Sequence, residues 1–139
     1  MNTLLIIDDD IGTQETLRAL LASEERRLEF VANPTKALAV ATGLQPDLIL
    51  LDVLMPGLDG FEVCRRIRAT PVLAEVPILL LTVLDDRDSR LAGIAAGADD
   101  FVSKPFDRAE LTMRVQSILR LNRYRRLLEE RTKVDQLTE

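Results

Sequence analysis

The sequence predicts an α/β fold in which five parallel β-strands form one sheet with helices on both faces. Short apolar runs alternate along the chain with segments whose apolar residues recur at helical spacing, and this alternation is typical of βα units. The run 48–51 is continuously aliphatic, as expected for a strand covered by helices on both sides. Since crossovers between parallel strands are right-handed, the predicted class is the doubly wound (βα)5 sheet.

The five βα units follow one another in order along the chain. Residues 4–7 form the first strand, and leucines at helical spacing mark the first helix. The second helix begins at Pro34, because proline suits the first turn of a helix. The third strand ends at Asp52, and the chain turns through Pro56 and Gly57 before the next helix. The predicted strands are 4–7, 28–31, 47–52, 77–82 and 99–102, and the predicted helices are 13–22, 34–42, 60–68, 88–96 and a last one from Asp107.

The length and composition suit one globular domain without repeats or low-complexity segments. The chain has 139 residues, of which 47% are apolar and 29% charged, which is enough for a sizeable core. No apolar run approaches the roughly 20 residues of a membrane helix, and the start lacks the pattern of a secretory signal. We therefore expect a cytoplasmic protein. The single cysteine, Cys64, is expected to be a small buried hydrophobe.

The charge argues against a general nucleic-acid binder, and the lack of a long apolar run argues against a membrane partner. The net charge is −5 and the isoelectric point is near 4.9. The last helix is basic, but it offers only Tyr124 as a group that could stack on a base, so a solvated helix face is the preferred interpretation. Its basic residues between 114 and 133 are Arg114, Arg120, Arg123, Arg125, Arg126, Arg131 and Lys133.

Polar side chains follow the strands at the carboxyl edge of the predicted sheet. Aspartates follow the first strand and end the third, a threonine ends the fourth, and a lysine comes after the fifth. Because the carboxyl ends of parallel strands lie on one edge, these residues should meet around one crevice. They are Asp8, Asp9, Asp10, Asp52, Thr82 and Lys104.

The chemistry of this set favours a phosphoryl-transfer site. Clustered carboxylates raise one another's pKa unless a cation lies among them, and Mg²⁺ is a hard cation that takes oxygen ligands and keeps waters. The Thr82 hydroxyl and the Lys104 ammonium could contact the oxygens of a transferring phosphoryl group. Asp52 is the natural nucleophile, because a carboxylate can form an acyl phosphate.

Four motifs occur in order and at fitting separations, namely IIDDD, LLDVLMPGLDG, LLLTV and GADDFVSKPF. Together they resemble the receiver domain of bacterial two-component response regulators. The resemblance predicts a receiver domain at 1–121, followed at 122–139 by an extended C-terminal helix or a linker. It also implies the flavodoxin-like strand order 2-1-3-4-5 and a cis Lys104–Pro105 peptide bond.

The resemblance implies a role for each acid of the site. Asp52 would accept a phosphoryl group from a sensor histidine kinase or a phosphotransfer protein. Mg²⁺, or Mn²⁺ in its place, would bind Asp9, Asp52 and the backbone carbonyl of Leu54, and Asp8 would support the metal through water. Asp10 is not expected to be a ligand, and no other cofactor is implied.

A switch is implied by the same resemblance. Thr82 and Lys104 would contact the phosphoryl oxygens, and movement of Thr82 would free space for Phe101. An inward Phe101 would alter the face formed by the helix 88–96, the fifth strand and the last helix. Plain core packing accounts for Phe101 equally well at this stage.

The absence of histidine and the charges near the last two helices indicate which partners the chain needs. It has no histidine, so the phosphoryl donor must be a separate protein or a small acyl phosphate. The domain is then a phosphoacceptor rather than an enzyme. A homodimer could form through charges near the fourth and fifth helices, namely Asp99 and Asp100 with Arg90, Arg114 and Arg120.

The last segment, RLNRYRRLLEERTKVDQLTE, is longer than the fifth helix of a receiver requires. Its closing VDQLT resembles the DxLT opening of diguanylate cyclase domains. The chain would then be the N-terminal receiver of a cyclic-di-GMP response regulator. A phosphodiesterase, a kinase module or a stand-alone receiver also stays open.

Three alternatives compete with a phosphorylated receiver. IIDDDIGT resembles the DxDGT motif of haloacid-dehalogenase-like phosphatases, with Asp8 as nucleophile and Asp10 as general acid, but Ile11 puts the match one residue out of register. A receiver-like module that binds without being phosphorylated conflicts with the complete set of site residues. A flavin-binding domain would need a phosphate-cradling loop after the first strand, and the sequence has none.

Overall fold

A computed structural model describes residues 1–84 and 86–138, with side chains up to residue 131. Its five parallel strands lie in the order β2-β1-β3-β4-β5, which confirms the predicted class and strand order. The strands are β1 (Asn2–Ile7), β2 (Arg26–Val31), β3 (Leu48–Asp52), β4 (Ile78–Thr82) and β5 (Asp100–Ser103). The helices are α1 (Ile11–Leu21), α2 (Ala37–Leu44), α3 (Gly60–Ala69), α4 (Arg87–Ala96) and α5 (Arg108–Thr138), with short 3-10 turns at Pro34–Lys36 and Pro71–Leu73.

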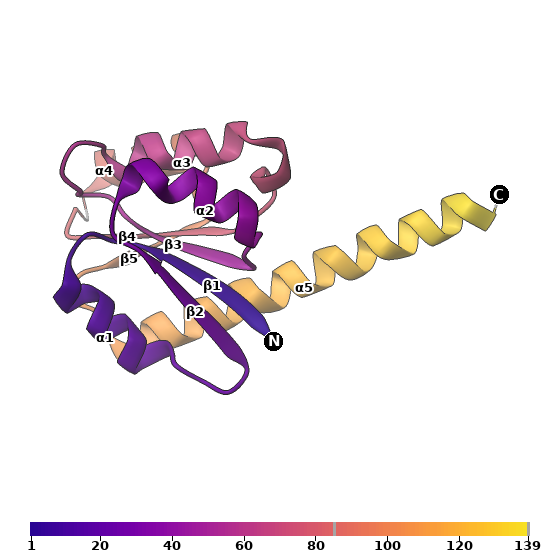
Figure 1. The fold of residues 1–139 in the computed structure, drawn as a ribbon, viewed down its shortest axis with the longest axis horizontal. Coiled ribbons are helices and arrows are strands. Elements are labelled where there is room, and N and C mark those ends of the chain that lie inside the picture. Colours follow the sequence, from indigo (N-terminus) through magenta and orange to yellow (C-terminus); the bar gives the residue numbers. More distant parts are fainter. Residues whose placement is uncertain (85, 139) are drawn as a thin grey trace.

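Helices cover the sheet from both sides. In Figure 1, α2, α3 and α4 lie over one face and α1 and α5 over the other. Side chains alternate along β1, so that Leu5 and Ile7 pack toward α2–α4 while Leu4 and Ile6 pack toward α1 and α5. All five residues of β3 are buried, as its central place requires. The two apolar cores hold the carboxyl ends of the strands at one edge.

Side-chain caps fix where the helices begin. Asp10 accepts a hydrogen bond from the backbone N–H of Thr13, so α1 begins at Ile11 rather than at the predicted residue 13. Asp59 and Asp86 cap α3 and α4 in the same way. Pro34 opens a 3-10 turn and not the predicted helix itself, and α2 follows from Ala37.

The strand boundaries also differ from the prediction. β1 begins at Asn2 rather than at residue 4, and β3 and β4 each begin one residue later than predicted. β2 begins at Arg26 because it pairs with the whole of β1, from Asn2 opposite Arg26 to Ile7 opposite Val31. The prediction used only the apolar residues of the strand, so it did not include the charged residues Arg26 and Arg27 at its start. β5 lies one residue later than expected. The Lys104–Pro105 peptide bond is cis, as predicted.

Cys64 lies at the contact between α3 and α4. It is fully buried, and its Sγ is 3.4 Å from the backbone carbonyl oxygen of Ala96. Burial raises the pKa of the thiol to about 11, so the group is protonated near neutral pH and unreactive. The expected role as a small core residue is confirmed.

Helix α5 continues well past the sheet as a single rod (Figure 1). Polar contacts tie its first overhanging turn to the domain. The buried Asn122 donates to the backbone carbonyl of Asp47 at 3.3 Å, and the guanidinium of Arg126 pairs with the Asp47 carboxylate at 2.5 Å. The side chains of VDQLT lie outside the described residues. Within the described part of the chain, no helix is both long and apolar enough to cross a membrane.

Gly60 is required by a close approach of backbones. It opens α3, and a Cβ at this position would collide with the backbone of Asp52 and Val53. We predict that Gly60→Ala lowers the free energy of unfolding by about 2 kcal/mol, because the end of β3 or the start of α3 must shift. Urea denaturation monitored by circular dichroism measures this change.

Gly43→Ala is the matched control. Gly43 lies in α2, and a Cβ added at this position would meet no atom within 4 Å, so alanine there should stabilise the helix by about 0.5–1 kcal/mol. Equal effects of the two substitutions would contradict the packing described for Gly60.

Candidate functional site

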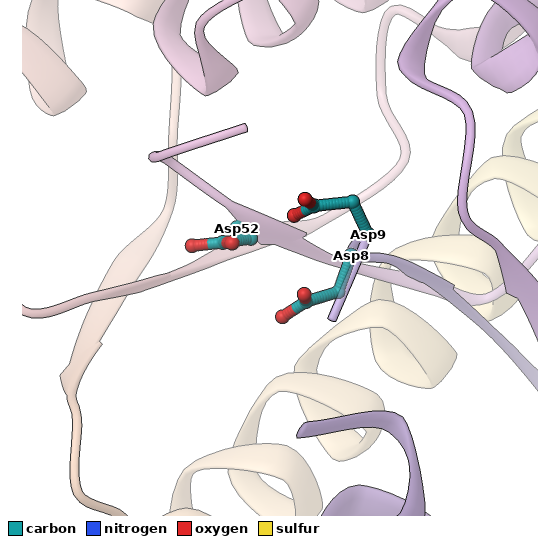
Figure 2. Close-up of side chains that lie close together, drawn as sticks. All are labelled: Asp8, Asp9 and Asp52. Carbon is teal, nitrogen blue, oxygen red and sulfur yellow. The ribbon is translucent and has the colours of Figure 1, made fainter. Parts of the chain in front are cut away.

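Three carboxylates converge at the carboxyl edge of the sheet. Asp8 and Asp9 follow β1, Asp52 ends β3, and these strands are hydrogen-bonded neighbours. One oxygen of each carboxylate lies within 4.8 Å of the others, and Figure 2 shows all three groups directed toward the same side. Asp8 is fully buried and Asp52 is 4% exposed. The strand pairing therefore brings together acids that lie more than forty residues apart in the sequence.

Lys104 is the cation of this cluster. Its Nζ lies 3.3 Å from Asp8 Oδ2 and 3.3 Å from Asp52 Oδ1. The lysine follows β5, and its backbone N–H donates to the Thr82 carbonyl at 2.8 Å, which fixes the loop against the end of β4. One ammonium thus contacts two buried carboxylates, and Asp9 adds a third negative charge. The site keeps a net negative charge that suits a further cation.

Burial controls the protonation of the two buried acids. Loss of solvation raises the pKa of Asp8 above its ordinary value, and the contact with Lys104 only partly opposes this change. Loss of solvation likewise raises the pKa of Asp52, and the nearby Asp8 raises it further. Both groups therefore favour either a proton or a bound cation in this environment.

The loop after β1 is held by hydrogen bonds on both sides of Asp8. The Asp8 carboxylate accepts from the Asp10 N–H at 2.9 Å, and the Asp8 carbonyl accepts from Gln14 Nε2 at 2.7 Å. Sequence reasoning missed Gln14, whose only signal was its place in the first turns of the adjoining helix. Asp10 turns away as the cap of α1, and hydrogen bonds from Thr13 hold its pKa below the ordinary value.

The predicted switch residues lie on the neighbouring strands β4 and β5. Thr82 is buried at the end of β4, and its Oγ1 accepts from the Leu84 N–H at 2.8 Å. Phe101, on β5, is half-buried and packs against the core on the α4 side of the sheet. A Cβ on Gly93 of α4 would collide with this ring, so the glycine makes the space that Phe101 occupies.

Three exposed apolar side chains lie close in sequence to the residues of the site. Ile11, Leu54 and Val83 follow the acids or the threonine of three different strand ends, and they are 73%, 51% and 60% exposed. The N–H of Leu54 donates to Asp52 at 3.3 Å. We refer to Ile11, Leu54 and Val83 together as the apolar rim.

Residues 4–116 match the family model described as the response regulator receiver domain. The chain belongs to this family. The match includes all five strands except the first two residues of β1, and it ends within α5.

Relatives of this receiver include the response regulator PleD of Caulobacter vibrioides, which is 41% identical over 117 residues, or 84% of this chain and 26% of PleD. The chain spans between a quarter and a half of the length of the curated relatives it matches. A putative response regulator of Chloroflexus aurantiacus has a similar structure, with a TM-score of 0.80, 40% identity and coverage of 85% of this chain and 97% of that one.

A third similar protein is the receiver domain of the sensor histidine kinase PA1611 of Pseudomonas aeruginosa. It gives a TM-score of 0.77 at 34% identity and covers 85% of this chain and 97% of its own. That structure has a magnesium ion coordinated in its active site cleft.

The raised pKa values predict how the receiver responds to pH without metal. A carboxyl group whose pKa is raised by folding contributes stability below its unfolded pKa, near 3.8, and loses that contribution as the pH rises through the folded value. We predict that Asp52→Asn is more stable than the wild type at about pH 7.5 in EDTA. The difference should vanish near pH 4 and shrink on addition of Mg²⁺.

Thermal unfolding measured across this pH range tests the prediction. Asp88→Asn serves as the control, because Asp88 is an exposed carboxylate in the first turn of α4 and its removal should produce no such gain. A wild type that gains stability relative to Asp52→Asn between pH 4 and 7.5 would contradict the proposed electrostatics.

Proposed function

We propose that this receiver is the phosphoacceptor of a two-component response regulator and that Asp52 takes the phosphoryl group. The supporting observation is the contact of Lys104 with both buried acids, 3.3 Å from Asp8 and 3.3 Å from Asp52. A carboxylate oxygen of Asp52 attacks the phosphorus atom and forms an acyl phosphate, while the bond from phosphorus to its donor breaks. The domain assists its own phosphorylation and is not an enzyme acting on a separate substrate.

The donor set fits a hard divalent cation. Oxygen ligands from Asp8, Asp9 and Asp52 suit Mg²⁺ or Mn²⁺, and a nearby backbone carbonyl such as that of Leu54 would complete the protein's share. Asp9 and Asp52 are the proposed direct ligands, with Asp8 acting through water. When bound, the ion neutralises charge on the acids and on the phosphoryl oxygens.

Lys104 and Thr82 supply the remaining contacts to the phosphoryl group. The Lys104 ammonium already faces Asp52, so it can pair with a phosphoryl oxygen without a large movement. The Thr82 hydroxyl can donate to another oxygen, because its present bond with Leu84 uses the hydroxyl as an acceptor. Both groups stabilise charge that develops during transfer.

The donor is a sensor histidine kinase or a phosphotransfer protein in the cytoplasm. These 139 residues contain no histidine, so the phosphohistidine of the proposed donor must lie outside them. The apolar rim offers such a partner exposed apolar side chains next in sequence to the strand ends of the site. Contact there would exclude water from Asp52 during transfer.

The signal leaves through α4, β5 and α5. A phosphoryl group on Asp52 attracts the Thr82 hydroxyl. The movement of Thr82 leaves space at the end of β4, and this space favours the conformation in which the Phe101 ring points inward. Phe101 already contacts the α4 side of the sheet through the gap left by Gly93. The coupling is a population shift between two packings of this ring.

The output lies in a covalently attached domain or in a downstream protein. The helical continuation of α5 to Thr138 and the VDQLT motif favour an attached diguanylate cyclase, which would make the full-length protein an enzyme of cyclic-di-GMP signalling. The receiver would then end near residue 121, although contacts with the domain extend to Arg126.

Dimerisation through the α4–α5 side is a further element of the proposal. Within one chain, Asp99 pairs with Arg68 at 2.8 Å and Asp100 with Arg114 at 2.6 Å. In a two-fold dimer, these acids would have to exchange their ion pairs within the chain for ion pairs with the second chain. Because Asp100 belongs to β5, a small rearrangement of β5 would then change the stability of the dimer.

The phosphatase alternative is less well supported. It requires Asp8 as an accessible nucleophile, whereas this side chain has no exposed surface, and it requires Asp10 as an acid, whereas Asp10 caps α1. The phosphatase alternative also gives Asp52 no role, and the chain belongs to the receiver family.

Intact-mass spectrometry after incubation with acetyl phosphate and Mg²⁺ tests the proposed function. We expect one phosphate adduct on the wild type, no adduct on Asp52→Asn, and no adduct in EDTA. Asp10→Asn is the matched control and should still be labelled, because Asp10 lies outside the proposed ligand set. Labelling that persists in Asp52→Asn and disappears in Asp8→Asn would overturn the assignment and favour the phosphatase chemistry.

A further inference from the structure

A pocket of about 220 Å³ lies at the opposite edge of the sheet from Asp52, between the starts of β1 and β2 and the helix α5. In Figure 1 the amino-terminal end of the sheet lies beside α5 at this point. Three arginines line the pocket, namely Arg26, Arg120 and Arg123. We propose that it binds a small phosphate-bearing anion, and this proposal does not depend on phosphorylation of Asp52.

The two α5 arginines of this pocket lack the acidic partners that three other α5 arginines have. Arg114, Arg125 and Arg126 each form ion pairs with acids. The side chains of Arg120 and Arg123, in contrast, form no hydrogen bond or ion pair within the described part of the chain. Two guanidinium groups are thus left without an acid in a protein whose net charge is −5.

The positive charges also oppose one another. Arg120 and Arg123 are three residues apart on α5, so they are neighbours on the helix surface, where like charges repel. Arg26 adds a third charge from the start of β2, and its guanidinium donates only to the Leu21 carbonyl, at 3.4 Å. Glu25 is the one acid in the lining. An anion in the pocket would relieve this repulsion.

The chemistry of the lining suits a phosphate group. A guanidinium presents paired N–H donors that match two phosphate oxygens. The amides of Asn2 and Gln116, which also line the pocket, can donate to a second phosphate or to an attached hydroxyl. The volume of about 220 Å³ suits a diphosphate or a compact phosphate ester.

Binding would connect α5 to the sheet just before the helix leaves the domain. Arg120 and Arg123 belong to α5, whereas Asn2 and Arg26 begin β1 and β2. An anion held by both sides would add an attachment next to the contacts that Asp47 makes with Asn122 and Arg126. The site could therefore stiffen α5 independently of the phosphoacceptor.

Thermal unfolding with sodium pyrophosphate as the probe tests this proposal. Experiments in EDTA at constant ionic strength avoid metal-dependent binding at the acidic site. We expect the wild-type Tm to rise by about 4 °C at ten times the dissociation constant. Arg120→Gln combined with Arg123→Gln should abolish the rise, and line broadening of the pyrophosphate phosphorus signal should disappear with it.

Arg108→Gln combined with Arg131→Gln is the matched control, because it removes the same charge from α5 away from the pocket and should leave the rise intact. Asp52→Asn should also respond as the wild type does, which separates this site from the phosphoacceptor. Equal loss in both double variants, or no response of the wild type at 10 mM, would overturn the proposal. Flotation with anionic phosphatidylglycerol vesicles without any response to pyrophosphate would overturn it as well.

Discussion

The arrangement of the site depends on holding two buried carboxylates beside one lysine. Asp8 and Asp52 end neighbouring parallel strands, and Lys104 reaches both of them from the loop after β5. Removing these acids from water raises their pKa values, so the apo site is electrostatically unfavourable near neutral pH. The two apolar cores supply the stability that keeps the strand ends together. In the function proposed above, a divalent cation and then a phosphoryl group would relieve this unfavourable electrostatic energy.

Much of this arrangement could be predicted from sequence because it follows from periodicity and topology. Continuous apolar strands specified a parallel sheet, and a parallel sheet puts Asp8, Asp52 and Lys104 on one edge. The positions that were missed depend on contacts that periodicity does not record. Arg26 begins β2 only because β1 offers a full-length partner. The hydrogen bond from Gln14 to the Asp8 carbonyl likewise needs α1 to be placed against the loop, and a sequence pattern does not reveal such a tertiary contact.

The sheet separates two charged regions that α5 connects. The acidic site lies at the carboxyl edge, and the arginine pocket lies at the amino edge, where α5 leaves the domain. Asn122 and Arg126 secure this exit through Asp47. A change in the packing of β5 could reach the overhanging helix through the first turns of α5, and an anion at the exit could strengthen or oppose that change. The receiver could then combine a phosphorylation signal with the concentration of a small anion.

Fluorine NMR with beryllofluoride tests the central claim most directly, because this phosphoryl mimic needs the acids, the metal and Lys104 together. We predict bound fluorine signals in the wild type only when Mg²⁺ is present, at one site per chain, with loss of these signals in Asp52→Asn and strong weakening in Lys104→Ala. Bound signals that persist without a divalent metal, or that remain in Asp52→Asn, would contradict a metal-dependent phosphoacceptor site built around Asp52.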